Sequence, residues 1–289
     1  MGNLQLFVAC VAIWGSTWLA IKFQLGSVAP EASVSYRFLL ASFLIACYCR
    51  ARKLSLAFPA REHKWIALFG VLMFGVSYVC VYYAEQHVVS GLVAVGYSAS
   101  PLLGALGMRF FFGAPISRRV ALGSVLGIVG IALVFWPEFS KLQGDGDTAV
   151  GAIFTVVAVV LSAGGTLTAH RNNEAHLPLW QTMAWGMLYG ALFSFATTFA
   201  LGERLSFELT PGYVLSLLYL AVLGSVAAFA AYLTLVRRVG AARAGYTGVM
   251  VPIVALVISA AFEGFHWSAL TWLGIAVSLS GNVIILRRR

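Results

Sequence analysis

Charged residues are scarce in this sequence: they make up 10% of its 289 residues, whereas hydrophobic residues make up 61%. A soluble globular domain has about 25% charged and roughly 45–50% apolar residues. A soluble fold of this length has too small an interior to bury so many apolar side chains. The composition therefore excludes an ordinary soluble protein and predicts that lipid surrounds most of the chain.

Cysteines are also few, and all four lie inside apolar runs. Cys47 and Cys49 form a C-x-C pair without a second pair or a nearby histidine. This spacing does not match a metal site, so we interpret the cysteines as structural. The sequence also lacks a phosphate-binding glycine loop and a Ser/His/Asp arrangement. We therefore expect no metal, no cofactor and no enzyme activity.

Carboxylates are missing from the middle of every hydrophobic run. Proton-coupled carriers usually need such a group within the membrane, so this lack favours facilitated transport or exchange over tight proton coupling. The net charge of +9 comes from short basic clusters between the apolar runs. Since no basic stripe is long enough to follow a phosphate backbone, the sequence excludes a nucleic-acid partner.

The hydrophobic residues form ten runs of roughly 18–25 residues, each long enough to cross about 30 Å of hydrocarbon. Lipid offers no partner for unpaired backbone groups, so these spans must be helices. The predicted fold class is therefore an all-α integral membrane protein with ten transmembrane helices. The spans lie near residues 4–21, 32–49, 64–84, 90–112, 118–136, 148–170, 180–201, 211–236, 241–262 and 267–286.

Successive loops between the spans must lie on alternate sides of the membrane. The basic residues divide unevenly between these two sides. Only three fall in loops of one side, namely Lys22, Lys141 and Arg204, and Arg37 lies within the second span. The others, including the arginines at 287–289, share the opposite side, which the positive-inside rule makes cytoplasmic. With ten spans, both termini are then cytoplasmic.

The two halves of the chain resemble each other at an offset of 151 residues. Each half contains five spans, and an odd number of spans per repeat forces the two halves into opposite orientations. Such inverted repeats are typical of secondary transporters. The sequence thus predicts two inverted five-helix repeats, residues 1–147 and 148–289. The matched pairs are Pro101 and Pro252, Gly113 and Gly264, Gly123 and Gly274, and Gly130 and Gly281.

One segment of the first half is distinctive. The run Trp14-Gly15-Ser16-Thr17-Trp18, followed by Lys22, Pro30 and Arg37, resembles the opening of an EamA-type domain. The resemblance covers the whole chain and extends to the ten-helix members of the drug/metabolite transporter superfamily and their bacterial aromatic amino-acid exporter branch. It implies a multi-pass transporter of a bacterial cytoplasmic (inner) membrane. The second half lacks the Trp-Gly pair and a counterpart of Arg37.

Aromatic residues are dense at depths where an interfacial belt would not reach. Several lie three or four residues apart and so share a helix face. Buried Tyr and Trp need a hydrogen-bond partner, which favours a polar cavity over plain helix packing, although both explanations remain open. The candidate substrate-binding aromatics are Trp14, Trp18, Tyr78, Tyr82, Tyr97, Phe229, Tyr232 and Tyr246.

Two basic residues are further candidates for substrate contact. Arg37 lies inside the second span, where a charge is costly. It could anchor a substrate carboxylate, extend to the headgroups, or pair with Glu31 or helix-end carbonyls. Lys22 closes the first span. It could form an outer gate, contact substrate, or lie among the headgroups.

Proline and glycine mark candidate mechanical elements. Pro101 and Pro252 lie deep in matched spans, where each removes a backbone hydrogen bond, kinks its helix and could assist gating. Small residues in the fifth and tenth spans form faces that let helices pack closely. Because both faces belong to one chain, we expect a monomer. These residues are Gly123, Gly127, Gly130, Gly274, Ser278 and Gly281.

Together these features predict a carrier whose partners are the lipid bilayer and a small-molecule substrate. An aromatic, uncharged cavity between the halves suits a flat apolar ligand. We expect low-affinity, downhill export of aromatic or other large neutral amino acids by alternating access. The alternatives are a proton-coupled antiporter of another metabolite or drug, and a membrane enzyme or lipid-handling protein. A channel would show a filter or charged rings.

Overall fold

A computed structural model describes residues 1–141, 147–239 and 244–286 of the chain. All regular elements within these residues are helices. Eight of them are long and apolar enough to cross a membrane, and two shorter apolar helices follow them in the chain. The prediction of an all-α membrane protein with ten helices is confirmed. Arg243 and residues 287–289, which contribute to the orientation prediction, lie outside the described residues.

The first half contains five spans, two of which are built from several helical pieces. The third span changes to a π-helical turn, η1, and the fourth contains a 3₁₀ turn, η2. The bounds are α1 (Asn3–Lys22), α2 (Pro30–Ala51), α3 (Ala60–Gly70), η1 (Val71–Val76), α4 (Ser77–His87), α5 (Ser90–Gly96), η2 (Tyr97–Ala99), α6 (Ser100–Phe112) and α7 (Arg118–Lys141).

The second half has a similar order, and its third span also contains a π-helical turn, η3. The two π-helical turns overlap at the same offset of 151 residues as the paired prolines and glycines. Such turns often mark functional sites. The bounds are α8 (Asp147–Glu174), α9 (Leu179–Ala200), α10 (Pro211–Leu218), η3 (Tyr219–Ala227), α11 (Ala228–Val239), α13 (Tyr246–Phe262) and α14 (Ala269–Leu286).

Local sequence explains several helix ends. Pro30 and Pro211 occupy the first turns of α2 and α10, where a missing backbone N–H costs nothing. Thr210 caps α10 by accepting a hydrogen bond from the backbone of Tyr213. The matched glycines Gly113 and Gly264 follow α6 and α13, and both have a φ of 70°. This left-handed conformation ends a helix and favours glycine.

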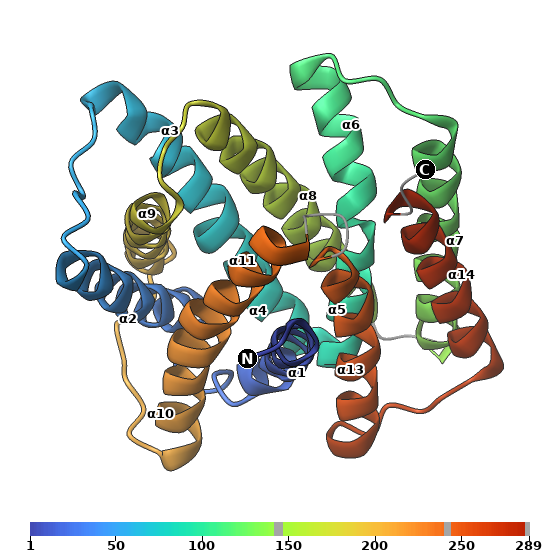
Figure 1. Ribbon diagram of the computed structural model, residues 1–289. Coiled ribbons are helices and arrows are strands. Elements are labelled where there is room, and N and C mark those ends of the chain that lie inside the picture. Colours follow the sequence, from blue (N-terminus) through green and yellow to red (C-terminus); the bar gives the residue numbers. More distant parts are fainter. Residues whose placement is uncertain (142–146, 240–243, 287–289) are drawn as a thin grey trace.

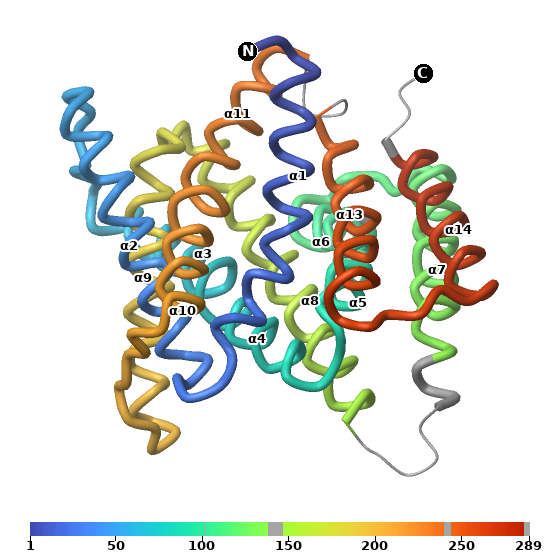
Figure 2. The backbone as a smooth tube through the Cα atoms, turned by 90° about the horizontal axis from the view of Figure 1, so that it is seen from below, coloured from blue at the N-terminus to red at the C-terminus, as the bar shows by residue number. Residues whose placement is uncertain are grey.

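Helices of equal rank in the two halves pack against each other. The second and seventh spans, α2 and α9, form one pair, and the fifth and tenth spans, α7 and α14, form another. Figure 1 shows these two pairs on opposite flanks of the molecule, with α1, α4, α11 and α13 between them. The start of α1 and the end of α14 lie at one end of the bundle, as Figure 2 shows. We call this end the terminus side.

The central helices α1 and α13 run in the same direction. Leu6 of α1 clusters with Ala244, just before α13. Lys22, at the other end of α1, lies 3.7 Å from Glu263, which follows α13. We call the end that holds this pair the far side. Contacts at both ends therefore define the top and bottom of the space between the two halves.

Three carboxylates that lie just outside the predicted spans are nevertheless packed among the helices. Glu31 lies in the first turn of α2 and Glu85 within α4, and both are 0% exposed. Glu263 is tied to helix ends by hydrogen bonds. The hydrophobic run ends before Glu85, but the helix continues to His87. Neighbouring helices then bury a residue that hydropathy alone places outside the membrane.

The prolines also differ from each other. Pro252 lies inside α13, as predicted. Pro101, predicted to kink a continuous helix, lies instead in the first turn of α6, directly after the 3₁₀ turn. The interruption of the fourth span therefore begins before the proline. The cause is that proline fits the first turn of a helix but cannot donate a hydrogen bond within one.

Candidate functional site

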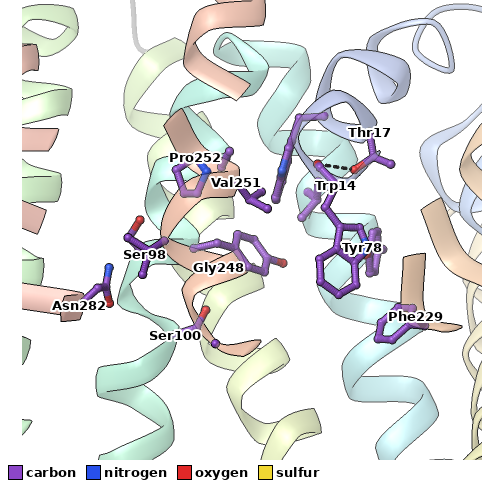
Figure 3. A pocket seen from close by; sticks show the side chains of 16 residues that line it. Trp14, Thr17, Tyr78, Ser98, Ser100, Phe229, Gly248, Val251, Pro252 and Asn282 are labelled. Atoms are coloured by element: carbon purple, nitrogen blue, oxygen red, sulfur yellow. Dashed lines mark hydrogen bonds between the residues drawn. The ribbon is translucent and has the colours of Figure 1, made fainter. Parts of the chain in front are cut away.

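A cavity of about 360 Å³ lies between the two halves, in the middle of the bundle. Its walls come from α1, α4, α5, the turn η2, α6, α11, α13 and α14 (Figure 3). The structure brings together six of the residues singled out in the sequence. They are Trp14, Trp18, Tyr78, Tyr97, Phe229 and Pro252.

Trp14 is held in place by both halves of the chain. Its indole Nε1 donates a hydrogen bond of 3.2 Å to the carbonyl of Gly224, which lies in the π-helical turn η3. Its ring contacts Phe229 and Tyr232 of α11, each with a centroid separation of 5.3 Å. The buried N–H thus has a backbone partner, and the ring forms a rigid wall.

Trp18 and Tyr78 complete the aromatic lining. The ring of Trp18 lies 5.2 Å from Tyr97 of η2. The ring of Tyr78 contacts Phe38 of α2 at 4.9 Å. Aromatic pairs at these separations are stabilised by about 0.5–1.5 kcal/mol beyond their buried area. Their faces are consequently fixed before any ligand enters.

Polar groups in the lining are few and uncharged. Thr17, Ser98, Ser100 and Asn282 contribute hydroxyl and amide groups, and among the described residues no acidic or basic side chain lines the cavity. Sequence reasoning did not single out Ser98, Ser100 or Asn282. The signal for Asn282 is a lone amide in the apolar tenth span, since polar residues in such spans face the protein interior.

Arg37 is buried behind the aromatic wall, with 2% of its surface exposed. Its guanidinium carbon lies 4.6 Å from the centre of the Tyr78 ring, a cation–π contact. Its Nε donates to Ser225 of η3 at 3.4 Å, and one terminal nitrogen has no hydrogen-bond partner. Glu31 instead accepts from Tyr83. Arg37 therefore neither extends to the headgroups nor pairs with Glu31.

A polar network closes the far side. Lys22 donates hydrogen bonds to the carbonyls of Glu85 and Val88, and its ammonium group lies 3.7 Å from the carboxylate of Glu263. Glu263 in turn accepts hydrogen bonds from the backbone and hydroxyl of Ser90 and from Ser259. The network joins α1, α4, α5 and α13, so it ties the first half to the second.

Glu85 is the least satisfied group in this network. Both of its carboxylate oxygens are buried, and neither has a hydrogen-bond partner among the described residues. Lys22, Arg37 and Glu263 are its charged neighbours. The cavity lining extends in the opposite direction, to Gly245 next to Ala244. The polar network therefore lies at the far side, whereas the described cavity lining reaches toward the terminus side.

The remaining sequence candidates lie outside the cavity lining. Tyr82 is 0% exposed and its hydroxyl has no hydrogen-bond partner. Tyr232 supports the ring of Trp14, and Tyr246 is half-buried. Lys22 belongs to the network at the far side. The side chain of Pro101 lies outside the described residues.

The glycine faces of α7 and α14 meet directly. A Cβ atom on Gly130 would lie 2.5 Å from the carbonyl oxygen of Gly274 and 2.6 Å from Cβ of Ser278. Gly123 and Gly281 approach each other in the same way, and Gly281 lies against the backbone of Gly127. Close approach of two helix backbones in a membrane requires such small residues. The contact lies within one chain.

Ten apolar helices in two matched halves, with a cavity lined by both of them, define a membrane transport protein. Sequence comparison agrees, because the EamA-like transporter family matches residues 1–136 and 149–287. The chain belongs to the EamA-like transporter family. Among the described residues, no group of three or more His, Cys, Asp or Glu side chains could hold a metal ion.

Related proteins carry transporter names. The inner membrane transporter YedA of Escherichia coli K12 is 30% identical, over 98% of this chain and 90% of its own. The transporter YoaV of Bacillus subtilis is 24% identical, over 96% of this chain and 90% of its own. A solved crystal structure, 16% identical, has the same fold, with a TM-score of 0.70 over 98% of this chain and 95% of its own.

Proposed function

We propose that this protein exports small amphipathic molecules with a flat aromatic body, and above all aromatic and other large neutral amino acids. The observation that carries this proposal is the central cavity, whose walls are aromatic and whose described lining contains no charged residue. Its volume of about 360 Å³ falls within the roughly 300–1,000 Å³ typical of small-molecule sites. A flat ring can stack between Trp14, Trp18 and Tyr78.

The charged ends of an amino acid need polar partners in this proposal. Thr17, Ser98 and Asn282 supply hydroxyl and amide dipoles in the lining. Arg37 adds positive charge behind Tyr78 at 4.6 Å from the ring. Since none of these groups forms a direct ion pair with the ligand, binding is weak. Weak binding suits an exporter, because tightly held cargo leaves slowly.

Alternating access follows from the two repeats, residues 1–147 and 148–289. The network at the far side opens when the halves rock, and the terminus side closes in exchange. The interruption at η2 and Pro101 and the matched Pro252 act as hinges. With both termini in the cytoplasm of a bacterial cell, the conformation described here takes up cargo from inside. The packing of α7 against α14 within one chain supports a functional monomer.

The energy source in this proposal is the substrate gradient alone.

Orientation and downhill transport are tested separately. For orientation, Arg204→Cys, in the connection between α9 and α10, should react with a membrane-impermeant thiol reagent only from outside the cell. A variant with its own exposed cysteine at position 47 replaced provides the background. Labelling at position 204 only in inverted membranes would show that the orientation is the reverse of the proposed one.

Proton-coupled exchange is the second candidate, and one observation favours it. Glu85 is a fully buried carboxylate without a hydrogen-bond partner, next to the Lys22–Glu263 pair that joins the two halves. Buried carboxylates in transport proteins often carry protons. Downhill transport was favoured because no carboxylate lies in the middle of a predicted span. Glu85 lies just beyond the third predicted span, so that argument did not consider it.

Counterflow in proteoliposomes tests both candidates. Vesicles loaded with unlabelled phenylalanine should take up radiolabelled phenylalanine or tryptophan with a saturable rate, and far less labelled glutamate. If no aromatic amino acid moves while another metabolite does, the proposed substrate is wrong and the carrier remains. If a pH gradient alone drives accumulation above equilibrium, downhill transport is wrong. Glu85→Gln should then abolish accumulation but keep counterflow, whereas the exposed-site control Glu174→Gln should change neither.

A further inference from the structure

A second pocket, of about 670 Å³, lies at one end of the bundle. It is formed where α2 ends, α9 begins and α11 ends, so three membrane spans leave the hydrocarbon around it. Arg238, next to the pocket on α11, donates to the carbonyl of Met1, which places the pocket on the terminus side. Its walls come from both halves of the chain. It is separate from the central cavity and shares no lining residue with it.

The charge of this pocket has one sign. Arg52, Lys53 and Arg237 line it, and its described lining contains no acidic residue. Among the described residues, none of these three cations forms an ion pair with a carboxylate. The guanidinium carbon of Arg52 lies 6.0 Å from the centre of the Tyr48 ring. Three unpaired cations around one hollow attract an anion, and guanidinium groups bind phosphate oxygens particularly well.

The inner wall adds a neutral donor. Gln181, in the first turn of α9, is 7% exposed, and its amide makes no hydrogen bond with the described residues. An anion in the pocket would satisfy this amide, which carries two N–H donors.

The rim of the pocket is apolar. Tyr48 and Trp180 pack against each other with ring centroids 5.2 Å apart. Tyr48 and Leu179 are each 41% exposed, and Leu54 is 36% exposed. Tyr and Trp at this level are typical of the membrane interface, where their rings meet the headgroups. A free anion would leave this apolar rim uncovered, whereas the glycerol and acyl chains of a lipid would cover it.

We propose that this pocket binds the phosphate of an anionic phospholipid, such as phosphatidylglycerol. Arg52, Lys53 and Arg237 hold the phosphate, Gln181 donates to it, and the acyl chains lie against Tyr48, Leu54 and Leu179. Basic pockets between membrane helices are general sites for such headgroups. A lipid bound here joins the ends of α2, α9 and α11 and thus bridges the two halves on the terminus side.

Native mass spectrometry of the purified full-length protein tests this site. The protein is titrated with phosphatidylglycerol and, separately, with phosphatidylcholine of the same chain length. One phosphatidylglycerol should bind at least tenfold more tightly than phosphatidylcholine. Equal binding of the two lipids would overturn recognition by charge. Soluble glycerol phosphate is the third arm, and if it competes as well as the lipid does, the site is one for free anions and the lipid proposal is wrong.

Substitutions locate the site within the basic region. Arg52→Gln and Arg237→Gln should each weaken phosphatidylglycerol binding at least about tenfold, because each removes a charge-assisted hydrogen bond to the phosphate. Arg50→Gln is the matched control, because Arg50 is exposed on the last turn of α2 but does not line the pocket. Its binding should stay within about twofold of the wild type.

Equal losses in all three variants would show diffuse attraction by a basic surface and would overturn the pocket. Thermal unfolding in a zwitterionic detergent, without added lipid, checks that each variant is folded. A variant that unfolds early is replaced by Arg52→Lys, which keeps the charge but not the bidentate geometry. That variant should retain most of the affinity, and complete loss would contradict the proposal. The result is independent of what the central cavity transports.

Discussion

The contact between α7 and α14 offers the sharpest test of the packing, because one helix face contains two glycines in different surroundings. A Cβ atom on Gly130 would meet the carbonyl oxygen of Gly274 and the amide nitrogen of Ser278, each at 2.5 Å. Ordinary contacts of a Cβ atom lie at 3.4–4 Å. An alanine at position 130 therefore forces the two backbones apart by about 1 Å, and overpacking of this kind costs about 1–3 kcal/mol.

Gly127 lies one turn away on the same face and serves as the control. A Cβ atom there would meet nothing within 4 Å. Alanine is favoured over glycine inside a helix by about 1 kcal/mol. Gly127→Ala should therefore leave the protein as stable as the wild type or stabilise it by up to about 1 kcal/mol. Gly130→Ala receives the same helical gain but should be destabilised by up to about 2 kcal/mol overall.

Thermal unfolding of both variants in the same detergent measures the difference. For a chain of this size, each kcal/mol shifts Tm by about 2–4 °C. Gly130→Ala should melt several degrees below Gly127→Ala, with the wild type between them. If both variants melt at the same temperature, the close approach of α7 and α14 is wrong. If Gly127→Ala alone is destabilised, the contact face is rotated from the one described here.

Three further outcomes follow. Trp18→Ala should lower the affinity for an aromatic substrate about three- to tenfold in counterflow, since it removes one ring contact, whereas lipid-exposed Trp136→Ala should not change it. Lys22→Met should loosen the far side, so that Thr17→Cys in the cavity reacts faster with a thiol reagent from that side; an unchanged rate would contradict the gate. Hydrogen bonds from Ser27 and Thr210 hold the pKa of Glu208 below its ordinary value. Its contribution to stability is therefore present at neutral pH and disappears as the pH falls below about 4.5, so the Tm difference between wild type and Glu208→Gln should vanish in acid.

The helices themselves could be predicted because each span must satisfy its own backbone hydrogen bonds in lipid. Composition along the chain is therefore enough to find them. The first span was predicted at residues 4–21 and is observed at Asn3–Lys22, and the seventh was predicted at 180–201 and is observed at Leu179–Ala200. The offset of the repeat also matches the positions of Gly113 and Gly264, which share one backbone conformation.

The aromatic lining shows where prediction from sequence stops. Tyr78 and Tyr82 are four residues apart and share a face of one helix. Tyr78 lines the cavity, whereas Tyr82 is fully buried outside its lining. Helical spacing tells which residues share a face, but the neighbouring helix decides whether that face meets a cavity or another side chain. The π-helical turn η3, which carries Gly224 and Ser225, gave no recognised signal in the sequence either.

The sequence by itself determined that lipid surrounds most of this protein, where its ten spans lie, and that its halves resemble each other. These features depend on composition and on patterns read along the chain. Only the tertiary structure decided which groups meet. Lys22 bonds to the carbonyl of Glu85, 63 residues away, and Trp14 bonds to the carbonyl of Gly224, 210 residues away. The burial of Glu85 and the walls of the cavity result from such distant contacts, which hydropathy along the chain does not contain.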